Sequence, residues 1–320
     1  MITTWLTEKL QLDVPVVGAP MAGPGEGPLA AAVSAAGGLG MVGVNASRSA
    51  KWIHEQAEIA AGPGRPYGIG LMAWALASNP AQLDAVLELA PALVSVSFGP
   101  VAAPVRRLRE AGITVAVQAG DLEESRRAVD AGAEVLVARG AEGGGHGRNE
   151  VGTLPLLQTV LEHVDVPVLA AGGIGTARGL AAVLAAGAAG AWVGTAFLGC
   201  REAGNSSAAR QRLFSATDTG TSYGRVFDVG LRLGWPAEYG GRGLRNAYFD
   251  RWADRLDALA ADDDAARELA EARAAGDYDT AYLYAGQGVG LLREERSAAD
   301  VLRDLAGAEE LLRRFGQGGS

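Results

Sequence analysis

The sequence predicts an α/β protein: a (β/α)8 or TIM barrel with a mostly helical C-terminal subdomain. Eight short segments rich in Val, Ile and Leu alternate with Ala- and Leu-rich helical segments over the first two-thirds of the 320 residues. The strand segments show little polar–apolar alternation, which is typical of parallel strands buried on both faces. Several helical segments end in Ala-Gly, as in "EAGITVAV" and "DAGAEVLV", where the glycine supplies a left-handed cap. An open doubly wound sheet is the alternative, but eight near-regular repeats favour a closed barrel.

In chain order, the strands are expected at residues 14–19, 39–44, 67–72, 93–98, 113–118, 134–139, 166–171 and 190–195. The intervening helices are expected at 27–36, 49–61, 80–89, 101–111, 122–131, 154–164 and 177–186. Residues 216–290 break this pattern, because they are richer in Gly, Arg and aromatic residues. We therefore expect a barrel formed by residues 1–215 and 291–320, with a terminal helix near 298–315, and an inserted substrate-side subdomain over 216–290.

The composition argues against several classes of protein. Apolar residues make up 48% of the chain and charged residues 20%, as in ordinary globular domains. The net charge of −9 and the lack of a basic block disfavour a nucleic-acid partner. The N-terminus does not resemble a secretory signal, and the apolar segment at 177–191 is interrupted by glycines and Arg178 and is too short for a membrane span. Cys200 is the only cysteine, which fits a reducing compartment, so we expect a soluble cytoplasmic protein without a membrane partner.

Glycine-rich loops follow the seventh and eighth predicted strands. They contain Gly172-Gly173 in "GGIGTARG" and Gly194-Thr195 in "GTAFLG". Backbone N–H groups at such helix starts bind anions, and these two loops are the usual phosphate position in a TIM barrel. Tight turning alone is the other interpretation of Gly172 and Gly173. Two such loops in succession favour a phosphate site.

The loop after the sixth strand, "RGAEGGGHGR", places His146 directly after three consecutive glycines. An imidazole takes or gives a proton near neutral pH, and the glycines would let the backbone approach a flat ligand. His146 is therefore the candidate catalytic residue, and a solvated surface histidine is the alternative. Glu142 is a second candidate base, although its carboxylate can instead bind backbone N–H groups. His54 and His163 lie on predicted helices and, like Cys200, are expected to be structural.

Four stretches, in this order and spacing, carry a resemblance to a known family: "GAPMAG", "RGAEGGGHGR", "VLAAGGIGTARGL" and "WVGTAFL". They resemble the nitronate monooxygenases, formerly called 2-nitropropane dioxygenases, which are FMN-dependent TIM-barrel oxidoreductases. The later stretches "RVFD", "GRGLRNAY" and "YAGQGVGLL" also resemble that family, so the similarity runs nearly end to end. Related FMN barrels, including enoyl-acyl-carrier reductases and NADH:quinone reductases, share similar loops.

The resemblance implies FMN bound across the barrel mouth. His146 corresponds to the family histidine beside the flavin, which serves as a base toward nitroalkanes or as a partner for the nitronate oxygens. Tyr284, in "YAGQ", lies in a stretch near the family's active site. Two departures stand out: Gly143 replaces the alanine of the family signature, and the third loop, "GLMAWA", is apolar where many relatives carry a polar residue. The residues that would contact the cofactor are Pro20, Met21, Ala22, Met72, Gln118, Gly144, Ala171, Gly172, Gly173, Gly194 and Thr195.

The resemblance therefore implies an FMN-dependent nitronate monooxygenase. Such an enzyme oxidises alkyl nitronates, and nitroalkanes if His146 removes the α-proton, with O2 to a carbonyl compound and nitrite. One alternative is an FMN-dependent NAD(P)H reductase of a quinone or enoyl thioester, and another is a non-enzymatic flavin-binding sensor. No metal is needed, and the His, Cys and carboxylate spacing offers no metal site. The expected partners are a small-molecule substrate and O2, and a homodimer is considered.

Overall fold

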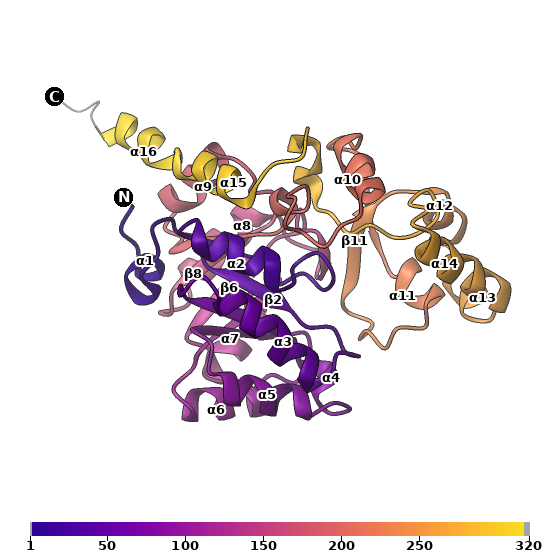
Figure 1. Ribbon diagram of the computed structural model, residues 1–320, viewed down its shortest axis with the longest axis horizontal. Coiled ribbons are helices and arrows are strands. Elements are labelled where there is room, and N and C mark those ends of the chain that lie inside the picture. Colours follow the sequence, from indigo (N-terminus) through magenta and orange to yellow (C-terminus); the bar gives the residue numbers. More distant parts are fainter. Residues whose placement is uncertain (1, 317–320) are drawn as a thin grey trace.

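The computed structural model describes residues 2–316 and contains a barrel of eight parallel strands (Figure 1). A parallel bridge between Val17 and Leu39 brings the first and last strands of the sheet together. The predicted (β/α)8 barrel is confirmed, and each predicted strand corresponds to one observed strand. In order around the barrel they are β1 (Val16–Gly18), β9 (Gly190–Val193), β8 (Val168–Ala171), β6 (Val135–Arg139), β5 (Thr114–Ala119), β4 (Leu93–Ser97), β3 (Tyr67–Met72) and β2 (Gly40–Gly43).

The barrel strands are buried on both faces, which explains their continuous apolar sequences. Val16 and Val168 pack with residues of the surrounding helices, whereas the next residues, Val17 and Leu169, belong to a separate core cluster with side chains of other strands. Leu6 of the short helix α1 (Trp5–Leu10) joins this second cluster and is fully buried near the start of β9. Helix α1 was not predicted from the sequence.

The predicted helices that follow the strands are confirmed. Side-chain oxygens of Asp121 and Thr176 accept backbone N–H groups at the starts of two of them. The glycines of the Ala-Gly pairs form left-handed turns, with φ of +76° at Gly112 and +98° at Gly132. These helices are α2 (Gly27–Ala35), α3 (Ala50–Ala61), α5 (Ala81–Leu89), α6 (Ala102–Glu110), α7 (Leu122–Asp130), α8 (Thr153–Leu161) and α9 (Ala177–Ala185).

The C-terminal segment forms two helices rather than the predicted one. Helix α15 (Ala298–Ala306) ends at Gly307, whose N–H bonds to the Asp304 carbonyl, and α16 (Ala308–Gly316) begins at the next residue. The expectation of one helix over 298–315 is wrong at this point, because glycine is a poor residue for a helix interior and here caps the first helix. Helix α15 packs against α2 and α9.

The segment after the barrel strands adds a small antiparallel sheet and further helices. β11 (Gly240–Leu244) lies between β10 (Thr221–Gly224) and β7 (Gly145–Gly147). The helices lie to one side of the barrel in Figure 1 and surround a core that includes Phe227 and Tyr248. Because β7 carries His146, which pairs with Gly241, this segment is attached directly to the predicted catalytic loop. The helices are α11 (Val226–Gly230), α12 (Ala247–Trp252), α13 (Leu256–Ala260) and α14 (Asp263–Ala275).

Within residues 2–316, no helix combines the length and apolar character needed to cross a membrane.

Candidate active site

A cavity of about 860 Å³ lies at the C-terminal ends of the barrel strands, beneath the inserted segment. Apart from Glu142, every residue predicted from the sequence to act in catalysis or to contact the cofactor or substrate lines it. The structure therefore brings these residues together, while their contacts with a cofactor or substrate stay predictions. They are Pro20, Met21, Ala22, Met72, Gln118, Gly144, His146, Ala171, Gly172, Gly173, Gly194, Thr195 and Tyr284.

The loops after β8 and β9 form an open set of backbone donors. Gly172 and Gly173 have φ of +112° and +71°, in the left-handed region that favours glycine. A Cβ on Gly172 would lie 2.5 Å from Oγ1 of Thr153. The N–H groups of Gly173, Gly175 and Thr195 donate to no acceptor within residues 2–316, and all three residues line the cavity. Unpartnered N–H groups with little side-chain cover fit the phosphate predicted at these loops.

His146 is held in β7 next to a buried carboxylate. Its Nε2 lies 2.9 Å from Oδ1 of Asp228, in α11. The Tyr284 hydroxyl donates to the same oxygen at 3.3 Å. The side chains of His146 and Asp228 are only 8% and 2% exposed, so the pair is shielded from water. Burial and the negative charge of Asp228 raise the pKa of Tyr284 well above its ordinary value, which keeps the phenol protonated as a donor.

Aromatic rings enclose the imidazole of His146. The Trp235 ring is stacked on it, with centroids 3.6 Å apart and planes 3° apart, and the Tyr284 ring meets it edge-on at 5.1 Å. Trp235 in turn contacts Phe98 and Trp74 at centroid distances of 5.2 and 5.4 Å. Nδ1 of His146 bonds to none of the described residues, yet it is not buried. Nδ1 is therefore accessible, and His146 lines the cavity.

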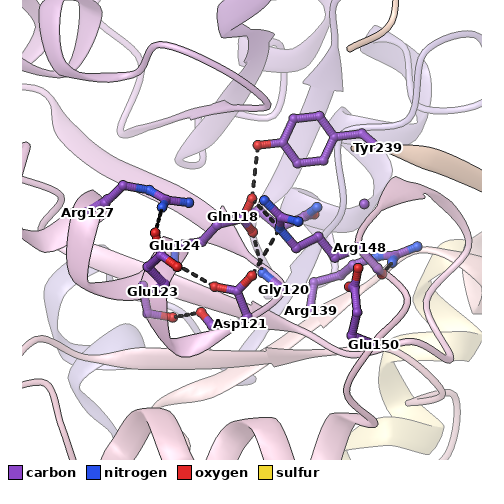
Figure 2. A network of polar contacts seen from close by, with 12 residues as sticks. Gln118, Gly120, Asp121, Glu123, Glu124, Arg127, Arg139, Arg148, Glu150 and Tyr239 are labelled. Atoms are coloured by element: carbon purple, nitrogen blue, oxygen red, sulfur yellow. Dashed lines mark hydrogen bonds and ion pairs between the residues drawn. The ribbon is translucent and has the colours of Figure 1, made fainter. Parts of the chain in front are cut away.

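The loop that carries Trp235 is anchored to the barrel through Tyr239 (Figure 2). The Tyr239 hydroxyl donates to Oε1 of Glu124 at 3.0 Å. Nε of Arg148 lies 2.8 Å from Glu124 and 3.0 Å from Asp121, and its guanidinium carbon lies 5.8 Å from the centroid of the Tyr239 ring. Burial, with the Glu124 charge, raises the pKa of Tyr239, so the phenol stays protonated and the anchor is kept at neutral pH.

The glycine-rich loop is wrapped around a buried arginine. Arg139, at the end of β6, is 3% exposed and donates to the carbonyl oxygens of Gly143 at 2.6 Å and Arg148 at 2.7 Å. Burial lowers the pKa of Arg139 to about 10, which still leaves a cation at neutral pH. A Cβ on Gly143 would lie 2.7 Å from Nε of Arg139, and one on Gly144 would lie 2.5 Å from the Gly286 nitrogen. These two glycines are thus required by packing within the protein, in addition to the predicted approach of a flat ligand.

The remaining candidates from the sequence have structural contacts. The Glu142 carboxylate accepts the N–H and the hydroxyl of Thr153, both at 2.8 Å, as its alternative interpretation predicted. Cys200 is fully buried, and burial raises its pKa to about 12, so it packs as an unreactive thiol. His54 lies in α3 and His163 lies just after α8; neither lines the cavity.

Asp228, Trp235 and Arg139 were missed as site residues. The sequence contains a signal for Asp228, because a single carboxylate in the apolar run "RVFDVG" is rarely buried without a partner. Trp235 gives no such signal, since its contact with His146 joins residues 89 positions apart (235 − 146) through the folding of a separate segment. Arg139 could be recognised only by asking which buried side chain donates hydrogen bonds to four carbonyl groups of the loop.

The barrel, the cavity at its mouth and the histidine beside a glycine-lined set of donors define a TIM-barrel enzyme. The chain belongs to the nitronate monooxygenase family, whose sequence profile matches residues 72–307. It is accordingly an oxidoreductase, and its relatives are flavoenzymes.

Individual relatives agree with this family over nearly the whole chain. The chain is 33% identical to a nitronate monooxygenase of Pseudomonas aeruginosa, covering 97% of this chain and 99% of the relative. It is 31% identical to one of Paraburkholderia phytofirmans, covering 97% of each. Among solved structures, FabK from Thermotoga maritima superposes with a TM-score of 0.83 at 26% identity over 99% of both chains. A nitroalkane oxidase from Streptomyces ansochromogenes has a TM-score of 0.82 at 31% identity, covering 98% of this chain and 99% of that one.

Proposed function

We propose that the protein oxidises alkyl nitronates, and neutral nitroalkanes after loss of the α-proton, with FMN and O2 to a carbonyl compound and nitrite. The observation that carries this proposal is that His146, whose Nδ1 is accessible and unpartnered within residues 2–316, lines the same cavity as Gly173, Gly175 and Thr195, whose N–H groups are also unpartnered. Membership of the nitronate monooxygenase family and the similarity to a nitroalkane oxidase support the reaction.

The proposed cofactor is FMN, because these loops offer one phosphate cradle at the position usual for TIM barrels. Gly172, Gly173, Gly194 and Thr195 would hold the phosphate. When bound, the flavin would supply the redox chemistry, taking electrons from the substrate and passing them to O2. Ala171, at the end of β8, would also hold the phosphate. The proposed flavin contacts are Pro20, Met21, Ala22, Met72, Gln118 and Gly144, and all of these residues line the cavity.

The protein's own groups would bind the substrate and move its proton. Neutral His146 would take the α-proton of a nitroalkane, and protonated His146 would stabilise the negative oxygens of a nitronate. Trp74, Phe98 and Trp235 form an apolar wall of the cavity that would exclude water and receive the alkyl group. The third loop contributes Trp74 to this wall, so its apolar sequence would serve the substrate where many relatives carry a polar residue.

Residues 216–290 are proposed to act as the substrate-side unit over a barrel of residues 1–215 and 291–320. Asp228, Trp235 and Tyr284 come from the inserted segment, and each contacts His146 or its carboxylate partner. The cradle glycines come from the barrel loops. Cofactor and substrate functions would therefore be divided between the two parts of the chain.

The proposal is tested on the purified protein. It should be yellow, release FMN rather than FAD on denaturation, and produce nitrite from a small nitronate in air. Colourless protein that fails to bind added FMN, or flavoprotein that yields no nitrite, would overturn the proposal. In the second case, bleaching of the flavin by NADH without O2 would indicate a reductase. Loss of every electron-donor activity would indicate a flavin-binding sensor.

Two finer expectations accompany this function. The single buried thiol of Cys200 supports a cytoplasmic location, since a reducing compartment preserves free cysteines. A homodimer is one assembly considered for the 32.7 kDa chain, and light scattering coupled to size-exclusion chromatography distinguishes it from a monomer.

A further inference from the structure

We infer that Asp228 is a positioning residue that makes Nδ1 of His146 the base toward neutral nitroalkanes. This inference rests on the proposed function and deepens it, because it names the atom that takes the proton and the charge that stabilises the protonated ring. It also predicts that Asp228 matters for neutral nitroalkanes far more than for nitronates that have already lost the proton.

The Asp228 carboxylate is buried with few polar partners. Oδ1 faces Nε2 of His146 and receives the Tyr284 hydroxyl, whereas Oδ2 is buried without a hydrogen-bond partner in the described structure. Between residues 2 and 316, no arginine or lysine forms an ion pair with this carboxylate. The Tyr282 phenol is close enough for the Asp228 charge to raise its pKa, and the Arg273 guanidinium carbon lies 5.2 Å from the Tyr282 ring centroid. His146 is therefore the group that can supply a direct positive charge.

The Asp228 carboxylate determines the tautomer of the neutral His146 ring. A carboxylate only accepts hydrogen bonds, so the neutral imidazole that faces Asp228 at 2.9 Å carries its hydrogen on Nε2. The lone pair of the neutral ring is then on Nδ1, the accessible nitrogen of a residue that lines the cavity. Stacking on Trp235 and the pairing of β7 with β11 hold the ring plane and the backbone, so the ring does not need to turn to present this atom.

This tautomer allows Nδ1 of His146 to take the α-proton of a neutral nitroalkane. The α-C–H bond of the nitroalkane breaks, its proton moves to Nδ1, and its electron pair enters the nitro group to give the nitronate. His146 becomes an imidazolium next to the Asp228 carboxylate, so the new positive charge is matched by an existing negative charge in a site shielded from water. The proton then leaves to water before the next turnover. A preformed nitronate does not require this step.

Asp228→Asn tests the inference, because asparagine keeps the size and an acceptor oxygen but removes the charge. With a neutral nitroalkane, kcat should fall by at least about 10²-fold, as expected for loss of general-base catalysis. With the preformed nitronate the fall should be less than about tenfold, and flavin content should match that of the parent. Asp250→Asn is the matched control, since Asp250 is a half-exposed carboxylate of the same segment that pairs with Arg245, and it should behave like the parent.

A spectroscopic measurement separates this role from a merely structural one. The chain has three histidines, so the ¹⁵N-labelled imidazole signals of His146 can be identified by their loss in a His146→Gln variant. The neutral parent ring should show hydrogen on Nε2 and none on Nδ1. In Asp228→Ala, which removes the acceptor, the fraction of the neutral ring with hydrogen on Nε2 should fall. Hydrogen on Nδ1 in the parent, or an unchanged tautomer in Asp228→Ala, would overturn the inference.

The kinetic results also separate this inference from the proposed function. Equal losses on both substrate forms in Asp228→Asn, or a parent that turns over nitronates but no neutral nitroalkane, would overturn the base assignment and leave nitronate oxidation intact. A parent without nitrite production from nitronates would overturn the proposed function, and the base role would be rejected with it.

Discussion

Nη2 of Arg139 donates a 2.6 Å hydrogen bond to the carbonyl oxygen of Gly143, in the loop that leads to His146. Nη1 of the same guanidinium reaches the carbonyl of Arg148, beyond the histidine. One buried side chain thus ties together both ends of the loop that carries His146. The planar guanidinium, with five donors, is suited to this task, whereas an ammonium is a point charge.

Arg139→Lys should therefore destabilise the protein although it keeps the charge. Lysine cannot reach the carbonyl groups on both sides of the loop, and each lost bond from a buried charged donor costs about 1.5–3 kcal/mol. We expect a loss of more than about 3 kcal/mol in the free energy of unfolding, measured by urea denaturation. Arg127→Lys is the matched control, because Arg127 pairs with Glu123 on the surface and should cost less than about 1 kcal/mol. Similar losses for the two variants would contradict this account of the loop.

The barrel and the gathering of its glycine-rich loops at one mouth could be predicted because their signals are local. The continuous apolar strands, the Ala-Gly caps and the glycine loops after β8 and β9 each express a requirement of a few adjacent residues. The barrel fold then brings distant loops to one mouth, so that Pro20, Gln118 and Gly173 line the same cavity. Repetition of a local pattern was sufficient for this inference.

The surroundings of the histidine could not be predicted in the same way. Asp228 and Trp235 reach His146 because β11 pairs with β7, and this pairing joins a three-residue strand to one about a hundred residues later. So short a strand of Gly-His-Gly carries no periodic pattern. The break at Gly307 was missed for a related reason, because an isolated glycine in a helical pattern fits either a kink or a cap.

Gly173→Val should weaken FMN binding beyond its effect on folding. The φ of +71° makes any β-branched residue strained there, and an added Cβ would lie 3.5 Å from Cβ of Glu142, in a loop that lines the cavity where the phosphate is proposed to bind. Gly64 has a φ of +67° and open space around its Cβ position, and it lies outside the cavity lining, so Gly64→Val carries the backbone strain alone. We expect the Kd for FMN, titrated by flavin fluorescence, to rise more than about tenfold only in Gly173→Val, which corresponds to about 1.4 kcal/mol. An unchanged Kd in Gly173→Val would argue that Gly173 serves the turn alone.

Cys200 should make the protein less stable as the pH rises above 9. Burial raises its pKa from an ordinary 9.0 to about 12, so between these values the unfolded thiol ionises while the folded thiol keeps its proton. The unfolded state then binds fewer protons, and stability falls by up to about 1.4 kcal/mol per pH unit from this group. Cys200→Ala should be less stable at pH 7, because it leaves a cavity, but should show a shallower decline from pH 9 to 10.5. Parallel declines in thermal unfolding temperature would exclude the thiol as a cause.

Removal of the His146 side chain should destabilise the protein. His146→Ala would leave the Asp228 carboxylate buried with only the Tyr284 hydroxyl as its partner, so a loss of about 3–5 kcal/mol in stability is expected. His146→Gln offers an amide N–H to Asp228 in place of Nε2–H, so it should be more stable than His146→Ala while still lacking a base. The difference between the two variants in urea denaturation therefore measures the cost of the unpaired carboxylate.

Both His146 variants should retain FMN, because the proposed cradle lies in other loops, yet lose activity. With a neutral nitroalkane, kcat should fall by about 10²–10⁴-fold, which corresponds to roughly 3–5 kcal/mol. A preformed nitronate needs no base, so its loss should be smaller and should reflect only the missing positive charge next to its oxygens. If His146→Gln matches the parent on both substrate forms, the histidine is a structural residue of β7, and the glycines before it serve only to enclose Arg139.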